Sequence, residues 1–313
     1  MSAGVGRGRR LLVIALWVGS LVGCNAPSTE LELEPLVQQG QQVVEENGLA
    51  VNGLAVNGLA VNGLAVNGLA VNGLAVNGLS TSTFSSWFSQ SPQMNAQVMR
   101  YLIGCAVPAG ETRTYTDPNT GVSYSWAGKL GLARRWGSGQ PATELEEQVI
   151  SACLAAHANP YGLNVNFSIL GLSAESEALP YSAQELQDYN VREACFFGNL
   201  FRNQGLYAGN DSTQLDASKS TNRGCGLSKV HSGSNPYCPA IVRVGTCDAA
   251  HCVADPTGTY YTQCTYNGVS YRPVTTRLES SSVNICGDGI CQVSEQCGLG
   301  TTADNCSDCG ACQ

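Results

Sequence analysis

Fifteen cysteines divide the 313-residue chain into three groups. Cys24 stands alone near the N-terminus, eight cysteines lie between residues 105 and 264, and six lie between residues 286 and 312. Two separately closed disulfide units require an even number in each of the larger groups, as found here. Bridges of this density indicate export, because the cytoplasm keeps thiols reduced. We therefore predict bridged cysteines in a central group (Cys105, Cys153, Cys195, Cys225, Cys238, Cys247, Cys252 and Cys264) and in a C-terminal group (Cys286, Cys291, Cys297, Cys306, Cys309 and Cys312).

The N-terminus has the features of an export signal. Three arginines precede an apolar run over residues 11–22, which is too short to span a bilayer comfortably. The run ends in Leu-Val-Gly-Cys, which resembles the lipobox of bacterial lipoproteins. The resemblance implies that residues 1–23 are a signal peptide and that Cys24 receives three acyl chains, such as palmitate, which act as the membrane anchor. Asn25, in place of an aspartate, implies the outer membrane, with the domains periplasmic or surface-exposed.

The charge of the chain limits its partners. The formal charge of −8 becomes −11 once the three signal arginines are removed, and the chain holds only three lysines. A nucleic-acid partner is excluded, because binding phosphates requires a basic patch. The membrane, through the lipid anchor, and an envelope protein or glycan remain as expected partners.

Residues 47–80 consist of six copies of Asn-Gly-Leu-Ala-Val and a final Asn-Gly-Leu-Ser. Leucine comes one place too late for a pentapeptide β-helix, and 34 residues are too few for a stacked solenoid. Glycine and asparagine in every copy oppose a helix. We predict a weakly structured stalk that follows a lipidated linker at residues 24–46, with self-association or partner docking as the alternative. The block resembles Asn-Gly-rich repeats that follow the lipobox in predicted myxobacterial lipoproteins.

Residues 84–282 are expected to form one α+β domain, since about 200 residues are enough for a real core. Apolar residues at helical spacing predict a helix after Pro92. Thr143 and Glu146 form a capping box that begins a second helix. Strands are predicted around residues 114–133, 161–172, 193–201, 239–247 and 260–280, with an Asn267-Gly268 turn in the last. The segments at residues 101–110, 131–136, 146–165 and 193–201 resemble a myxobacterial exported domain of unknown function.

Two helices of this domain each carry a cysteine on the face that we expect to be buried. Cys105 lies near the end of the first helix and Cys153 near the end of the second. We predict that these two cysteines form a bridge that clamps the helices together. His157 ends the second helix, where a cation relieves the C-terminal dipole, so we predict a structural role for it.

Motifs for catalysis are weak. The stretch Gly-Thr-Cys-Asp-Ala-Ala-His-Cys-Val at residues 245–253 is similar to the histidine motif of chymotrypsin-like proteases, but no Gly-Asp-Ser-Gly loop follows it. His231 has a neighbouring serine but no nucleophile-elbow context. Zinc is an alternative to bridges at Cys238, Cys247, His251, Cys252 and Cys264, but the spacing matches no compact finger.

The C-terminal cysteines lie among glycine and acidic residues, which cannot form an apolar core, so bridges must replace one. The pattern from Cys-Gly-Asp-Gly through Glu-Gln-Cys to Cys-Ser-Asp-Cys resembles the myxobacterial disulfide-rich repeat. Residues 298–305 depart from that family's Asp-Asp-Gly-Asn run. The spacing at Cys306, Cys309 and Cys312 also imitates an iron–sulfur or zinc-ribbon pattern, but we favour bridges. Calcium is an alternative for this segment, with oxygen ligands from Asp288, Glu295, Asp304 and Asp308.

The sequence thus predicts a disulfide-stabilised α+β protein with helices on a small antiparallel sheet, an N-terminal repeat stalk and a cysteine-rich module at residues 283–313. We expect no catalytic residue and no resident cofactor apart from the possible calcium. The expected role is interaction with an envelope protein or glycan, and the alternative is an exported hydrolase. A shallow surface of exposed aromatic residues favours the former, and an acidic, histidine-containing pocket favours the latter. Candidates for such a surface are Trp126, Trp136, Tyr260, Tyr261, Tyr266 and Tyr271.

Overall fold

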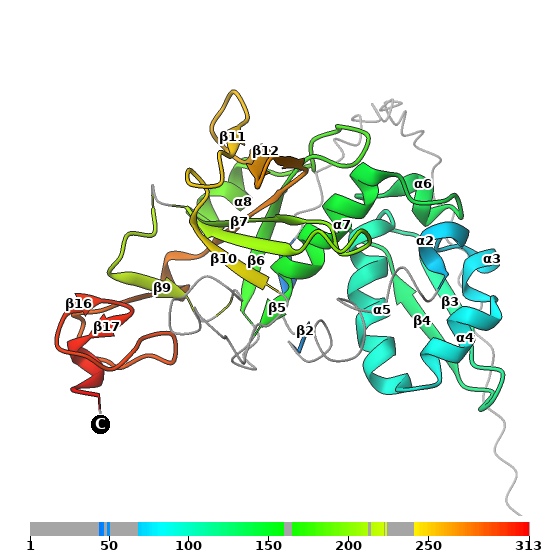
Figure 1. Cartoon of the computed structure of the whole chain (residues 1–313), viewed down its shortest axis with the longest axis horizontal. Coiled ribbons are helices and arrows are strands. Elements are labelled where there is room, and N and C mark those ends of the chain that lie inside the picture. The colour runs from blue at the N-terminus through cyan, green and yellow to red at the C-terminus, as the bar shows by residue number, and fades with distance from the viewer. Residues whose placement is uncertain are drawn as a thin grey trace, which may run out of the picture. The chain divides into compact units, whose positions relative to one another are not determined.

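Helices and sheets are mixed in the structure, as the predicted α+β class requires (Figure 1). It is a computed structural model that describes residues 44–46, 49–50, 68–159, 165–211, 214–221, 223 and 241–312. Cys24 with its predicted signal, Cys225, Cys238 and His231 lie outside these residues. No helix among the described residues has the length and apolar character needed to cross a membrane.

The largest sheet has six strands, and most neighbouring strands in it run antiparallel. Its order is β1 (Val44–Glu46), β6 (Asn166–Gly171), β14 (Val274–Leu278), β7 (Val191–Gly198), β8 (Leu206–Asn210) and β10 (Ile241–Thr246). The β8–β10 pair is parallel, which is the one departure in this sheet from the predicted antiparallel pattern. The central strands β14 and β7 are almost wholly buried, because packing covers both of their faces.

Smaller sheets surround the main one. Three of them are β11 (Val253–Ala254) with β12 (Tyr261–Tyr266) and β13 (Val269–Tyr271), the hairpin β3 (Thr112–Thr116) with β4 (Ser123–Ala127), and the parallel pair β2 (Leu49–Ala50) with β5 (Ala158–Asn159). Asn267 and Gly268, both at positive φ, form the turn between β12 and β13, as the Asn-Gly signal predicts.

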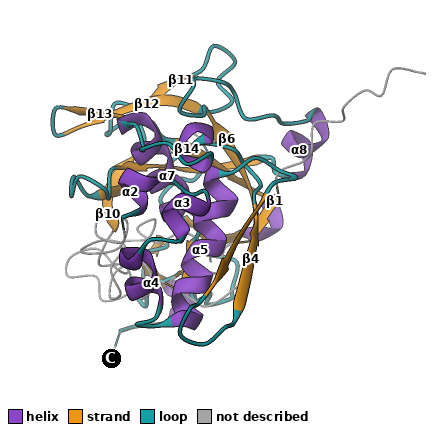
Figure 2. Cartoon of the chain, turned by 90° about the vertical axis from the view of Figure 1, so that its right-hand side faces the viewer, coloured by secondary structure: helices purple, strands orange, loops and turns teal. Residues whose placement is uncertain are grey.

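Two long helices form the helical layer. They are α5 (Pro92–Ala106) and α7 (Glu144–Ala156), and they pack against each other. Thr143 and Glu146 make the predicted capping box at the start of α7. The predicted bridge between Cys105 and Cys153 joins the two helices, and both cysteines are buried. Figure 2 shows α5 beside β4 of the hairpin.

Five shorter helices complete the described α-helical segments. They are α4 (Ser82–Phe88), α6 (Arg134–Gly137), α8 (Ala183–Asp188) and the pair α2 (Leu69–Asn72) and α3 (Val76–Leu79), with 3-10 turns at Ser280–Ser282 and Ser307–Cys309. Phe84 and Phe88 of α4 make edge-on contacts with Tyr115 of the hairpin, with ring centroids 4.9 and 4.8 Å apart. These aromatic contacts fix the hairpin to the helical layer.

The last copies of the repeat belong to the folded domain, so the prediction that all of residues 47–80 form a stalk is wrong for them. Leu69, Leu74 and Leu79, one from each successive copy, are buried. The backbone N–H of Leu74 donates to the carbonyl of Trp136 at 2.9 Å, and the indole N–H of Trp136 donates to the carbonyl of Leu69 at 2.7 Å. Gly73 approaches Gly139 so closely that a Cβ at residue 73 would overlap its backbone. The domain therefore begins before the predicted boundary at residue 84.

The cysteine-rich segment closes with three bridges of its own, which pair Cys286 with Cys306, Cys291 with Cys309 and Cys297 with Cys312. Its short strands are β15 (Val283–Ile285), β16 (Thr301–Thr302) and β17 (Asn305–Cys306). β15 pairs with β9 (Lys219–Thr221) of the central region, and the hydroxyls of Ser220 and Ser294 lie 2.8 Å apart. The segment is thus attached to the central domain by backbone pairing as well as by chain continuity.

A buried ion pair connects β7 with the segment that precedes the outer strand β10. The guanidinium of Arg223 donates to the carboxylate of Glu193, and both side chains are fully buried. The hydroxyls of Thr221 and Thr276 also donate to this carboxylate, each at 2.8 Å. Because the charge of Glu193 is neutralised and hydrogen-bonded, the pair is a structural element of the core.

Candidate functional site

A pocket of about 300 Å³ lies beside His157, and we refer to it as the His157 pocket. It lies at the junction of α5, β4 and the C-terminal end of α7. The pocket is lined by Arg100, Tyr101, Gly104, Ser125, Trp126, Ala127, Lys129 and His157. Its volume is at the lower end of the range for small-molecule sites.

Gly104 helps to create the space in the His157 pocket. It lies one helical turn after Arg100, so the two residues share a face of α5. Its carbonyl accepts hydrogen bonds from the backbone N–H groups of Lys129 at 3.2 Å and Leu130 at 2.8 Å. These bonds hold the residues after β4 against the helix, while the missing side chain at residue 104 leaves the pocket open.

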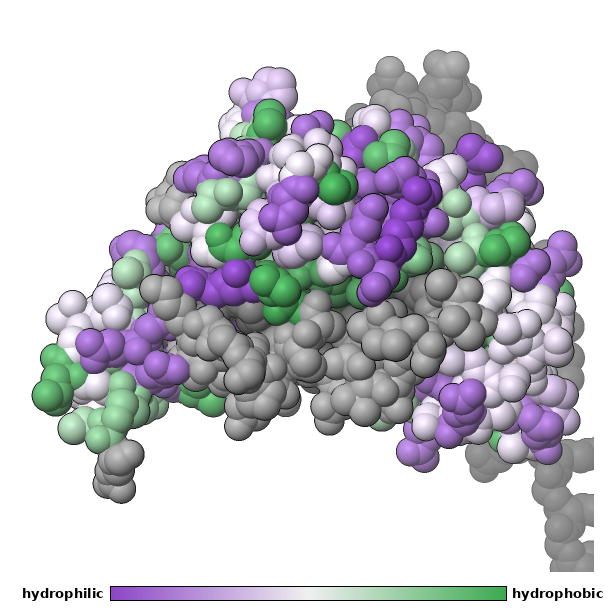
Figure 3. Space-filling view, in the orientation of Figure 1, coloured by the Kyte–Doolittle hydropathy of each residue, from purple (hydrophilic) through white to green (hydrophobic). Residues whose placement is uncertain are grey.

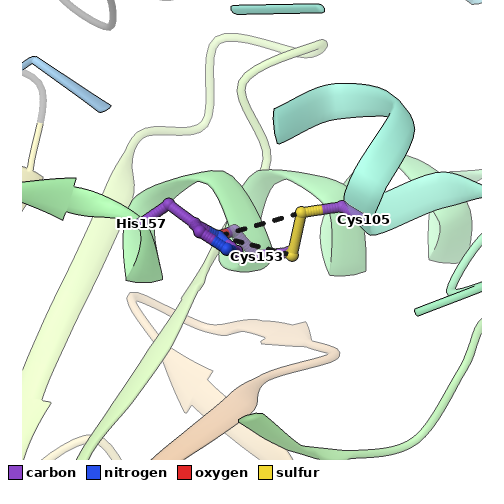
Figure 4. A group of neighbouring side chains, drawn as sticks. All are labelled: Cys105, Cys153 and His157. Carbon is purple, nitrogen blue, oxygen red and sulfur yellow. Dashed lines mark hydrogen bonds between the residues drawn. A yellow bond between two sulfur atoms is a disulfide. The ribbon is translucent and has the colours of Figure 1, made fainter. Parts of the chain in front are cut away.

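His157 is almost fully buried and caps α7, in agreement with its predicted structural role. Its Nδ1 lies 2.8 Å from the carbonyl oxygen of Cys153, and 3.8 and 4.0 Å from the sulfurs of Cys153 and Cys105 (Figure 4). Because a carbonyl oxygen only accepts hydrogen bonds, Nδ1 carries the hydrogen in this contact. This nitrogen is therefore occupied by the helix end and is not placed to act as a general base.

The described residues that line the His157 pocket include two cations. Arg100 and Lys129 are exposed at its rim, and none of the other lining residues in the described part of the chain is acidic. A second pocket, of about 170 Å³, lies where the cysteine-rich segment meets the central domain. That pocket is lined by both signs of charge, since Lys219 and Arg243 face Asp216 and Asp304. The described lining of the His157 pocket thus differs from that of the second pocket, which contains both signs of charge.

The aromatic residues that were candidates for an exposed binding surface are mostly buried. Trp136 is fully buried, and Trp126, Tyr260, Tyr261 and Tyr271 are each less than 9% exposed, with Tyr266 half-buried. Burial raises the pKa of the Tyr261 hydroxyl to about 12, and nearby Asp211 adds to this. These residues therefore do not provide the exposed aromatic surface that would favour a binding role, because the fold packs their rings against neighbouring elements.

Residues 245–253 form a bridged turn. Cys247 pairs with Cys195, and Cys252 pairs with Cys264 across the β11–β12 edge. His251 is exposed at positive φ in the turn, which is consistent with the interpretation that it is a surface residue. Cys247, Cys252 and Cys264 are therefore not available as zinc ligands, since each sulfur is bonded to another sulfur.

The four carboxylates considered for calcium do not gather in one place. No group of three among them has ligand atoms within 4.8 Å of one another in the described residues. Asp288 accepts hydrogen bonds from the backbone of Ile290 and the amide of Gln292, each at 2.8 Å. Burial raises the pKa of the Glu295 carboxyl, and Asp288 and Asp308 add to this. These carboxylates hold the loops of the bridged segment, and Asp304 lies at the second pocket instead.

Few features of the sequence point to the His157 pocket. Trp126 and His157 were noted for other reasons, and Arg100 and Lys129 lie in no recognisable motif. Only the contact of α5 with α7 and the hairpin brings them together.

Comparison with known proteins adds no assignment. The chain matches no family model, no curated protein and no solved structure. The resemblances noted for the lipobox, the repeat and the C-terminal cysteines therefore stay predictions from the residues.

Proposed function

We propose that this protein is an exported lipoprotein of the outer membrane whose disulfide-stabilised domain binds a component of the cell envelope. The observation that carries the proposal is the His157 pocket, whose described lining residues include Arg100 and Lys129 and no carboxylate. Such a lining suits the binding of a ligand better than hydrolysis, which requires a paired acid and base or an activated nucleophile. The paired cysteines are in keeping with an oxidising compartment.

In this proposal Cys24 carries the acyl chains, and residues 25–43 join it to the first strand. Nineteen residues can span at most roughly 65 Å. The domain would then act close to the membrane surface. The repeat acts less as a long stalk than we expect from sequence, because its strand β2 pairs with β5 and leucines of α2 and α3 are buried in the domain.

Two measurements test the proposal. The intact mass of the native protein under oxidising conditions is expected to show a chain that begins at Cys24 with three acyl groups and no free thiol. A Cys24→Ala variant is the control, and it should remain unacylated. Purified ectodomain is expected to capture an envelope component, whereas failure to do so together with turnover in a hydrolase screen would reverse the assignment.

A further inference from the structure

The second pocket, where the cysteine-rich segment meets the central domain, is lined by two side chains with unmatched polar atoms. Oδ1 of Asn210 and Nε of Arg243 are buried and have no hydrogen-bond partner among the described residues. Asn210 is only 8% exposed, and Arg243 is half-buried. Burying a polar atom without a hydrogen bond is unfavourable, and more so for a charged group. The two atoms therefore point to a ligand that brings both an acceptor and a donor.

A β-bulge directs Arg243 into this pocket. Strands β8 and β10 pair in parallel, and their register shifts between Arg243 and Thr246. Residues three apart on a regular strand point to opposite faces of the sheet, because side chains alternate. The extra residue at the bulge breaks this alternation, and both Arg243 and Thr246 line the pocket. Gly245, at a φ of +86°, lies in the bulge and also lines it. The bulge thus places the guanidinium of Arg243 on the same side as the end of β10.

Charges of both signs lie around the two unmatched atoms. The ammonium of Lys219 and the carboxylate of Asp216 are 3.1 Å apart and form an ion pair at the pocket wall. Burial lowers the pKa of the Arg243 guanidinium, whereas the charge of Asp304 raises it. A ligand in this pocket therefore meets a cation and an anion within a short distance, which suits a molecule that carries both charges itself.

The volume of the second pocket limits the size of the ligand. At about 170 Å³ it lies below the range of sites for drug-sized molecules. It has room for roughly six water-sized groups, at about 30 Å³ each. The cysteine-rich segment forms part of the wall, where the backbone N–H of Ala303 donates to the carbonyl of Ala217 at 2.9 Å. An ammonium and a carboxylate on one carbon, with a small side chain, fit this space.

From these observations we infer that the second pocket binds a small α-amino acid as a zwitterion. The carboxylate of the ligand accepts hydrogen bonds from the guanidinium of Arg243. Its ammonium donates to Oδ1 of Asn210 and is attracted by the charge of Asp304. A simple carboxylic acid would leave Asn210 unmatched, and a simple amine would leave Arg243 unmatched. The inference goes beyond the proposed envelope binding, because it concerns a different pocket, and it involves no reaction.

Saturation-transfer NMR with the mature chain made without acyl groups tests the ligand class. Alanine is the probe, propionate lacks its ammonium, and ethylamine lacks its carboxylate. All three carry a methyl group whose signal can be compared. We expect saturable binding of alanine, with propionate and ethylamine each at least about tenfold weaker, because each loses a charge-assisted hydrogen bond. Propionate or ethylamine that binds as tightly as alanine would overturn the amino-acid assignment, and so would the lack of a saturable alanine signal.

Substitutions locate the binding. Arg243→Met should abolish alanine binding, because it replaces the guanidinium with an apolar side chain. The same variant should keep the urea midpoint of the parent or raise it, since it removes a buried donor that has no hydrogen bond within the described structure. Arg135→Met, at an exposed arginine of α6, is the matched control and should change neither quantity. Asn210→Ala should weaken alanine binding about tenfold and leave propionate binding unchanged.

The variants also show how the inference could fail. Alanine binding that survives in Arg243→Met would place the ligand elsewhere. If Arg243→Met instead lowers the urea midpoint, the guanidinium serves the fold, and Asn210→Ala then decides. An unchanged affinity for alanine in Asn210→Ala would overturn the inference, whereas a loss confined to alanine would support it.

Discussion

Leu74 offers a direct test of whether the repeat is part of the fold. It occupies the same place in its copy as every other leucine of the repeat, yet it is fully buried and its backbone N–H donates to the carbonyl of Trp136. Replacing Leu74 with alanine removes three buried carbons, at about 0.8 kcal/mol each. A residual cavity adds to this, so the free energy of unfolding should fall by about 3 kcal/mol.

Urea denaturation followed by tryptophan fluorescence measures this change, since Trp136 hydrogen-bonds to the same part of the repeat. Val71→Ala is the matched control. Val71 belongs to the adjoining copy and is 68% exposed, so its loss should change the free energy of unfolding by less than about 0.5 kcal/mol. If Leu74→Ala were as mild as Val71→Ala, the repeat would be a tether throughout and our description of α2 and α3 would be refuted.

Two further perturbations test other parts of the structure. Replacing both Cys105 and Cys153 with alanine should lower the free energy of unfolding by about 4 kcal/mol. The bridge between them closes a loop with a sequence separation of 48 and so restricts the unfolded chain. The same change at Cys252 and Cys264, with a separation of 12, should cost about 3 kcal/mol, and a reversed order in urea denaturation would contradict the loop-entropy explanation. Burial raises the pKa of the Glu185 carboxyl above its ordinary value of 4.5, so the folded state holds this proton more tightly than the unfolded chain. The free energy of unfolding should therefore fall as pH rises from the ordinary pKa through the raised one, and Glu185→Gln should remove that part of the slope. Urea midpoints for both proteins between pH 4 and pH 8 give the comparison, and parallel pH profiles would disprove the assignment.

Exposed apolar residues occur singly among the described residues of the face drawn in Figure 3. Figure 3 shows hydrophobic residues scattered among hydrophilic ones over the visible face. In the cysteine-rich segment Ile290, Val293 and Leu299 are more than half exposed. Bridges hold this segment together without a core, so apolar side chains on its surface are expected and need no partner.

Sequence alone determined the features that depend on neighbouring residues. The capping box at Thr143, the helix after Pro92 and the Asn267-Gly268 turn are local signals, and each formed where it was predicted. The bridge between Cys105 and Cys153 was also predictable, because helical spacing placed both cysteines on buried faces. These features can be predicted from neighbouring residues, without knowing which other elements the segment contacts in the fold.

Tertiary structure alone decided the fate of the repeat and the position of the pocket. The same pentapeptide supplies a strand at Leu49–Ala50 and a helix at Leu69–Asn72. Identical sequences have identical local preferences, so the difference comes from their partners: β5 pairs with the first, and Trp136 bonds to the second. The His157 pocket likewise draws Arg100 and Lys129 from separate elements. Contacts between residues distant in sequence cannot be read from local propensity, because their free energy appears only when the whole chain has folded.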